Sequence, residues 1–296
     1  MKVPADLALT LAAAVDAGSL DAATRRLHVT QSAVSQRLAT LERLTGHVLL
    51  VRSRPVRATP AGENVIRYAR QVAHLDEALA AELGAGGGAN ALALAVNADS
   101  LATWILAPLA TAATEHGVLL HLHREDEGHT TALLANGTVA AAVTTVATPV
   151  PGCTVTPLGV LTYRAVAAPA FARRWFPDGP TDATLTAAPV LDFDARDTIQ
   201  SRYLESRGID PFAPPRHYVP SSTEFARAIA LGLGWALLPD VQRDGLELVE
   251  LGGPEVHVTL FWQQWRTHAP ALVAMADAVR AAASEALSPV ATPGRA

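Results

Sequence analysis

The sequence predicts a chain in three parts: a small all-α head, one long helix, and an α/β body built from two similar halves. Short helical patterns with capping residues between them fill residues 5–58. Apolar residues then recur at helical spacing over residues 60–83, and beyond residue 90 strand and helix patterns alternate. Strand–helix–strand repeats form parallel sheets with helices on both faces. We therefore expect three units, residues 1–59, 60–88 and 89–296.

The head has the pattern of a helix-turn-helix. Gly18 ends a first predicted helix, and Ser19 can cap a second helix over residues 21–29. Thr30 stands at the N-cap position of a third helix, residues 31–43, which turns Val34, Leu38 and Leu41 toward the core. The opposite face of this third helix carries amides, hydroxyls and one guanidinium: Gln31, Ser32, Ser35, Gln36 and Arg37.

Such groups at the start of a second motif helix suit the base edges and phosphates of a DNA major groove. Residues 49–62 add Arg52, Arg54 and Arg57 in a turn-rich hairpin, which suits a wing along the phosphate backbone. The first 60 residues carry eight basic against four acidic side chains, whereas the whole chain has a net charge of −5. An ordinary solvated helical domain is the alternative. Pattern and charge together favour a head that binds double-stranded DNA through Thr30, the polar helix face and the three wing arginines.

Residues 60–83 predict one long helix that begins at Pro60 and ends before the glycine-rich segment GAGGG, residues 84–88. No partner for its apolar stripe is evident in the head. A long helix with such a stripe tends to pair with another copy of itself, so we expect a homodimer or a homotetramer. The stripe consists of Val65, Ile66, Ala69, Val72, Ala73, Leu75 and Leu79.

The body alternates between strands and helices in two units that leave a cleft at the carboxyl ends of the strands. The first unit has expected strands at 91–97, 119–125 and 139–145 and helices at 100–115 and 129–136. The second has expected strands at 159–169, 189–194, 217–222, 234–239 and 256–265 and helices at 222–231 and 270–287.

Polar residues cluster at the predicted cleft. Asp99 and Ser100 open one helix and Ser221 and Ser222 another, where backbone N–H groups favour an anion such as an α-carboxylate. Strand ends add further polar groups: Glu125, Asp126, Thr144, Asp192 and Asp194. Any one carboxylate is more often simply solvated, but together they suit a zwitterion with an extra positive charge. Lysine or arginine is therefore the expected ligand.

The sequence lacks the combinations of residues that a catalytic or metal site requires. His121 and His123 share a strand face with Glu125, but a solvated histidine pair is the favoured interpretation. Cys153 has no evident histidine partner, and no nucleotide-binding, metalloprotease or hydrolase motif occurs. We expect neither enzymatic activity nor a cofactor or metal. With no apolar run of about 18 residues and one cysteine, we expect a cytoplasmic, nucleoid-associated protein with no membrane contact.

The segment ATRRLHVTQSAVSQRLATLERLTGHVLLVRSRPVRATPAG resembles the winged helix-turn-helix of LysR-type transcriptional regulators. Ala58 departs from the family pattern, where leucine is common, and is expected to weaken wing packing without abolishing it. Further segments resemble the arginine/lysine-responsive subfamily (ArgP-, LysG- or IciA-like): NADSLATW, LTYRAVA, LDFDARDTIQ, VPSSTEFARAIALGLGWALLP and WQQWR.

The resemblance implies a periplasmic-binding-protein-like effector domain, with crossing strands near 145–162 and 262–270. Subdomain I would comprise residues 89–161 and 267–296, and subdomain II residues 162–266. It also implies a regulator whose promoter binding responds to lysine or arginine and which controls amino-acid export or biosynthesis genes. RNA polymerase is a further candidate partner. A regulator with another effector, or a solute-binding or enzymatic α/β protein with an incidental head, remains an alternative.

Overall fold

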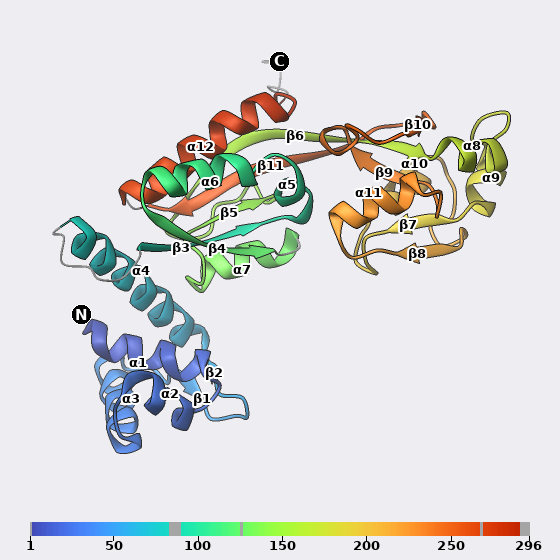
Figure 1. Cartoon of the computed structure of the whole chain (residues 1–296). Helices are drawn as coiled ribbons and strands as arrows, with labels where there is room; N and C mark the ends of the chain where they lie inside the picture. The colour runs from blue at the N-terminus through green and yellow to red at the C-terminus, as the bar shows by residue number, and fades with distance from the viewer. Residues whose placement is uncertain (1, 83–89, 125–126, 267–268, 291–296) are drawn as a thin grey trace, which may run out of the picture.

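The computed structural model describes residues 2–82, 90–124, 127–266 and 269–290. A helical head, one long helix and a two-part α/β body follow each other along the chain (Figure 1), as predicted. The glycine-rich segment 84–88 lies outside the described residues. No helix in the described ranges is long and apolar enough to cross a membrane.

The head contains three helices and a short hairpin, and the predicted caps are present. The Ser19 hydroxyl accepts a hydrogen bond from the Ala22 amide (3.1 Å), and the Thr30 hydroxyl accepts one from the Ala33 amide (3.2 Å). Val34, Leu38 and Leu41 are buried in the head core, as predicted. The elements are α1 (Ala5–Asp16), α2 (Leu20–Leu27), α3 (Gln31–Thr45), β1 (Leu50–Val51) and β2 (Arg57–Ala58).

The long helix α4 (Pro60–Glu82) is fixed to the head at its start. The Thr59 hydroxyl accepts from the Gly62 amide at 3.1 Å. A Cβ at Gly62 would lie 2.0 Å from the Leu49 carbonyl oxygen, so only glycine fits there. Ile66 and Ala69 are buried, and α4 packs along α1. The expectation that α4 has no partner in the head is therefore wrong for its first half. In the second half, Leu75 and Leu79 are 53% and 54% exposed.

Subdomain I is built on parallel strands, with β3 between β4 and β5. The predicted helix 100–115 is instead two helices, because the amides of both Trp104 and Ile105 donate to the Ser100 carbonyl and the helical register changes there. The elements are β3 (Asn90–Val96), α5 (Ala98–Thr103), α6 (Leu106–Glu115), β4 (Val118–Arg124), α7 (Glu127–Ala135), β5 (Ala141–Thr144) and α12 (Pro270–Ala286).

Two long strands, β6 (Cys153–Ala167) and β11 (Val256–Trp265), run through both subdomains and pair antiparallel (Figure 1). The expected crossing segments 145–162 and 262–270 are thus displaced, and the boundary expected at 161/162 falls inside β6. The sheet is mixed, in the order β10-β6-β11-β5-β3-β4 with β9 also paired to β6. The expected parallel pairing is present in β3–β4, β3–β5 and β7–β8, whereas the crossing strands β6 and β11 run antiparallel.

Subdomain II packs short helices around β9 and the small parallel sheet β7–β8. Its helices α8, α9 and α10 were not among the elements predicted from the sequence. The elements are α8 (Pro169–Trp175), α9 (Asp182–Ala187), β7 (Val190–Asp192), α10 (Ile199–Ser206), β8 (Arg216–Tyr218), α11 (Ser222–Ala230), β9 (Ala236–Pro239), the 3₁₀ turn η1 (Asp240–Gln242) and β10 (Val249–Glu250).

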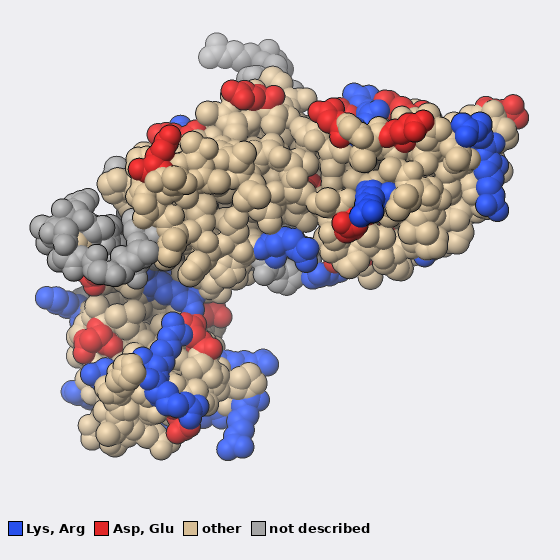
Figure 2. All heavy atoms as spheres, viewed as in Figure 1, with Lys and Arg blue, Asp and Glu red and all other residues tan. Residues whose placement is uncertain are grey.

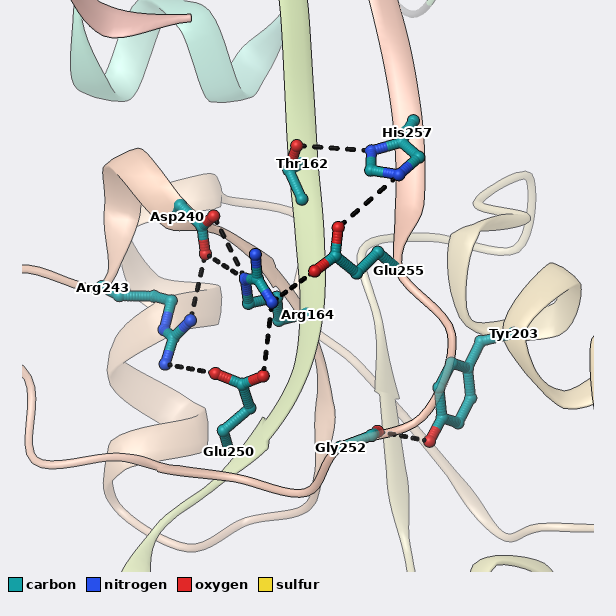
Figure 3. A network of polar contacts seen from close by, with 9 residues as sticks. All are labelled: Thr162, Arg164, Tyr203, Asp240, Arg243, Glu250, Gly252, Glu255 and His257. Atoms are coloured by element: carbon teal, nitrogen blue, oxygen red, sulfur yellow. Dashed lines mark hydrogen bonds and ion pairs between the residues drawn. The ribbon is translucent and has the colours of Figure 1, made fainter. Parts of the chain in front are cut away.

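A polar network fixes η1 to the crossing strands (Figure 3). Arg164 of β6 donates to Asp240 at 3.1 Å and forms ion pairs with Glu250 and Glu255. Arg243 joins Asp240 to Glu250 from the other side, at 3.0 and 3.3 Å. The network holds the turn that carries Gln242, which lines the cavity described next.

Candidate functional sites

The outer face of α3 presents most of the polar groups predicted to read DNA. Gln31, Ser32, Ser35 and Gln36 are exposed at the start of the helix. Arg37 is an exception, because its side chain is half-buried and its guanidinium lies 3.5 Å from the Thr10 hydroxyl of α1. The placement of Arg37 on the outer face was therefore wrong: it follows the side of α3 that packs on α1.

The hairpin after α3 carries the three predicted wing arginines. Leu50 pairs with Ala58 and Val51 with Arg57, which makes a two-stranded wing. Ala58 is half-buried and packs against the head core, so the departure from the family pattern leaves the wing in place. Arg52, Arg54 and Arg57 are exposed and have no ion-pair partner within the described chain. Basic side chains are conspicuous on the head in the space-filling view (Figure 2).

The body contains a cavity of about 400 Å³ between the two subdomains. Subdomain I contributes the residues that follow β3, Tyr163 projects from the crossing strand β6, and subdomain II supplies the rest. The lining residues are Asn97, Ala98, Asp99, Tyr163, Phe193, Asp194, Arg196, Asp197, Thr198, Ile199, Gln200, Phe225, Leu237, Leu238, Pro239 and Gln242. A volume of this size suits an amino acid or a similar small molecule.

Asp99 joins the two subdomains across this cavity. Its carboxylate accepts one hydrogen bond from the Ser222 hydroxyl at the start of α11 and one from the Tyr163 hydroxyl, both at 2.6 Å. Gln242 in turn donates to the Ser222 hydroxyl at 3.0 Å. Burial raises the pKa of Asp99, although the bonds from Ser222 and Tyr163 oppose the shift. An opposite charge in the cavity would stabilise the ionised carboxylate.

The loop between β7 and α10 supplies two more carboxylates. Asp194 accepts from the Arg196 amide at 2.7 Å, and this bond contributes most to lowering the pKa of Asp194. Asp197 accepts from the amides of Ile199 (2.9 Å) and Phe193 (3.1 Å), so it orders the loop while lining the cavity. Arg196 is the one basic residue in the described lining. The cavity therefore has three carboxylates and one guanidinium around it.

Acceptors without partners also lie near the cavity. The side-chain oxygens of Asn97 and Gln200, which line it, and the hydroxyl of Ser100 are buried and make no hydrogen bond within the described structure. Buried polar atoms normally have partners, so these atoms are ready to bind a ligand or water.

Several residues predicted for the cleft lie elsewhere. Asp192 is buried in an ion pair with Arg216 of β8, so the predicted ligand role of Asp192 is contradicted by its structural pairing. Thr144 is buried and accepts from the Val146 amide at 3.2 Å, away from the cavity lining. Ser221 precedes α11 and is not among the cavity-lining residues. Ser222 does not line the cavity either, but its hydroxyl bonds to Asp99, which does. Glu125 and Asp126 lie outside the described residues.

Sequence reasoning missed Tyr163, Phe193, Asp197, Gln200 and Gln242. Tyr163 lies within LTYRAVA, and Phe193, Asp197 and Gln200 lie within LDFDARDTIQ, two segments that carried the family resemblance. These segments were the available signal. No sequence signal pointed to Gln242, because a 3₁₀ turn after β9 brings it to the cavity.

The other candidates give no chemistry. No cluster of His, Cys, Asp and Glu among the described side chains could hold a metal ion. Cys153 is buried, and burial raises the pKa of its thiol to about 11, which disfavours the thiolate that acts as a nucleophile.

Comparison with known proteins places both halves of the chain in one family. Residues 6–63 match the model "Bacterial regulatory helix-turn-helix protein, lysR family", and residues 85–284 match "LysR substrate binding domain". The lysine export transcriptional regulatory protein LysG of Corynebacterium glutamicum is 39% identical over 285 residues, which cover 95% of this chain and 98% of that protein.

Two solved structures are similar over their whole length. The crystal structure of ArgP from Mycobacterium tuberculosis has a TM-score of 0.85 and 40% identity, covering 96% of this chain and 98% of that one. Full-length LysG from Corynebacterium glutamicum with bound effector Arg has a TM-score of 0.83 and 37% identity, covering 97% and 100%. The chain belongs to the LysR family of bacterial transcriptional regulators, with a helix-turn-helix head that binds DNA and a two-subdomain effector domain.

Proposed function

We propose that this regulator responds to a basic amino acid, lysine or arginine, and controls genes for amino-acid export or biosynthesis. The observation that carries the proposal is the charge around the cavity. Asp99, Asp194 and Asp197 outnumber Arg196 three to one, which favours a ligand with net positive charge. The relatives add support, since one is a lysine export regulator and another was solved with the effector Arg.

The proposed ligand lies with a cationic group near Asp99 and its carboxylate near Arg196. The partnerless oxygens of Asn97 and Gln200 supply further acceptors for ammonium or guanidinium donors. Because Asp99 is bonded to Ser222 across the cleft, a cation beside Asp99 changes the contact that joins the subdomains. A ligand that binds one arrangement of the subdomains better shifts the population toward it. The resulting change in head spacing would alter DNA bending.

On the DNA side, we propose that Gln31, Ser32, Ser35 and Gln36 read base edges, with Thr30 and the wing arginines contacting phosphates. The exposed Leu75 and Leu79 of α4 support a homodimer through this helix, or a tetramer built from such dimers. A protein acting in this way would be associated with the nucleoid.

The proposal is tested by measuring the melting temperature of the full-length protein in the presence of each of the twenty amino acids. A ligand that binds only the folded state stabilises it, by about 2.7 kcal/mol at a hundredfold excess over Kd. We expect L-lysine or L-arginine to raise the melting temperature, and neutral or acidic amino acids to leave it unchanged.

The matched control is norleucine, which keeps the length of lysine but lacks the side-chain cation. Stabilisation by a neutral amino acid with no effect of lysine or arginine would show that the effector belongs to another class. Equal stabilisation by norleucine and lysine would show that the carboxylates do not select the cation.

A further inference from the structure

One arginine joins all three parts of the chain. Arg70, in the middle of α4, donates to the Asp16 carboxylate at the end of α1 in the head. The same guanidinium donates to the Asn136 carbonyl at 2.8 Å and to the Thr138 hydroxyl at 2.9 Å, both in subdomain I. Arg70 is 20% exposed, so most of this junction is shielded from water. Arg26 of α2 adds a second, longer contact to Asp16, at 3.4 Å.

The subdomain I side of the junction is the carboxyl end of α7. Arg67 donates to the Ala135 carbonyl at 3.4 Å, so two arginines of α4 bind carbonyls that have no partner within the helix. Gly137 follows with φ +77°, and a Cβ there would lie 3.2 Å from the Cα of Arg67. The turn after α7 therefore rests directly on the backbone of α4.

The strand that precedes α7 contacts subdomain II beside the effector cleft. Arg124, the last residue of β4, lies over the Phe193 ring at 5.9 Å, and Phe193 lines the cavity in subdomain II. Helix α7 begins at Glu127, three residues further along the chain. With nine residues α7 spans about 13 Å, and its buried Thr130 and Leu134 hold it against the sheet.

Little apolar packing competes with these polar contacts. A space of about 390 Å³ lies between the head, α4 and subdomain I, lined by Ala12, Ala13, Leu27, Ala73 and Ala91 as well as by Arg70 and Asp16. Displacing the head from subdomain I at this space would break hydrogen bonds and expose little additional apolar surface. The hydrogen bonds of this junction can be present or absent, and an element that couples two sites requires two such states.

We propose that Arg70 is the residue that couples the effector cleft to the DNA-binding head, with α7 as the rigid element between them. A change in how the subdomains meet at Arg124 and Phe193 shifts α7. Its carboxyl end then makes or breaks the bonds to Arg70, which also positions the head through Asp16. The coupling to ligand rests on the proposed function, whereas the junction itself does not.

The junction is tested without any effector by spin-label distances between His47→Cys in the head and Ala110→Cys on α6, both exposed positions. Labelled full-length chains are diluted into unlabelled ones so that only distances within one chain are observed. We expect one narrow distribution for the parent protein and a broad one for Arg70→Gln. Thr138→Val, which removes the Thr138 acceptor and leaves the Asn136 carbonyl in place, should broaden it in the same direction but to a smaller extent.

Arg25→Gln is the matched control, because Arg25 is an exposed head arginine whose ion pair is with Asp21 of its own helix. It should leave the distribution unchanged. An unchanged distribution in Arg70→Gln would overturn the proposal. Broadening in the nearly isosteric Thr138→Val as well would show that the effect of Arg70→Gln is not a folding defect.

DNA fragments are first selected from a random library with the parent protein. Coupling is then measured as the ratio of the affinity for this DNA with saturating L-lysine or L-arginine to the affinity without it. Arg70→Gln should bring this ratio about 2- to 30-fold closer to one. The DNA-free protein should still bind the amino acid, with a Kd that changes by no more than the coupling that is lost, because the effect of one site on another is reciprocal. A ratio that keeps its full size in Arg70→Gln contradicts the coupling role. A ratio of one in the parent protein contradicts the proposed function instead, and the spin-label result still decides the junction.

Discussion

At the scale of single residues, Asp99 determines how the cleft should respond to pH. Burial raises the pKa of Asp99, and only its ionised form attracts a cationic ligand. Affinity for lysine or arginine should therefore be greatest above that raised pKa and should fall as the pH falls through it. Asp99→Asn should lower the affinity about 10- to 100-fold and abolish this pH dependence, because a charge-assisted hydrogen bond is lost. Isothermal titration calorimetry from mildly alkaline to mildly acidic pH measures both effects.

Asp178→Asn is the control for this experiment, since Asp178 is an exposed carboxylate in the loop after α8. The side chains of lysine and arginine stay cationic over the range used, and their α-amino group only gains protons as the pH falls, so a loss of affinity at low pH reports on the protein. If Asp99→Asn retains the pH dependence of the parent protein, another carboxylate binds the cation.

Asp99 and Asp192 show why only part of the site could be predicted. Asp99 was predicted from its place at a helix start and Asp192 from its place at a strand end, and of the two the structure places only Asp99 in the cavity lining. Asp192 pairs with Arg216, 24 residues away, and no pattern in the nearby sequence predicts that partner. Tyr163 comes from a strand whose position depends on pairing with β11, nearly 100 residues later. Local periodicity predicts the start of α3 well, because its caps and core face lie within one helix.

At the scale of elements, the buried pair Asp192–Arg216 stabilises the small sheet β7–β8. The two side chains are 3% and 12% exposed. Arg216→Ala would leave an uncompensated buried carboxylate, which typically costs about 3–5 kcal/mol. We expect that decrease in the free energy of unfolding of the effector domain. All five tryptophans lie between residues 104 and 265, so tryptophan fluorescence in a denaturant titration reports on this domain and not on the head.

Arg202→Ala controls for loss of an arginine, because Arg202 is exposed on α10 near the same sheet. Such surface changes usually stay within about 0.5 kcal/mol. The double substitution Asp192→Asn, Arg216→Ala should recover part of the lost free energy of unfolding, because the unpaired charge of Asp192 is also removed. Equal losses in the single and double variants would mean that the arginine acts by packing and not by pairing.

The elements themselves were predicted unevenly, for a physical reason. The long apolar stripe of α4 gives its start correctly and its end within one residue. The short helices α8, α9 and α10 have six to eight residues each, too few for a periodic signal to emerge. The expected parallel pairing occurs in both halves, but the antiparallel pairing of the crossing strands β6 and β11 was not predicted, because it depends on contacts far apart in sequence.

At the scale of the whole molecule, charge is divided between the two ends of the chain. The first 60 residues carry an excess of basic side chains, while the complete chain has a net charge of −5. An acidic effector domain repels a polyanion, so DNA should be bound by the head alone. The wing arginines Arg52, Arg54 and Arg57 are exposed and available for this contact.

Binding by these arginines predicts a specific dependence on salt. Each phosphate neutralised on B-DNA contributes about −0.9 to the slope of log K against log salt concentration. Two heads in a dimer offer six wing arginines, so replacing Arg52, Arg54 and Arg57 by Gln should reduce the slope by about 5. Fluorescence anisotropy with labelled duplex DNA at several salt concentrations measures it. Arg173→Gln with Arg174→Gln, at the exposed end of α8, removes two positive charges per chain from the effector domain and should leave the slope unchanged.

Gln36→Ala separates reading of sequence from attraction to phosphate. Gln36 is exposed on α3 and uncharged, so its loss should weaken discrimination between DNA sequences by about 1–3 kcal/mol while the salt slope stays the same. The wing variant should do the reverse, because phosphate contacts carry no base identity. If the wing variant keeps the parent slope while the α8 variant reduces it, DNA runs along the effector domain, and the division of charge along the chain has another purpose.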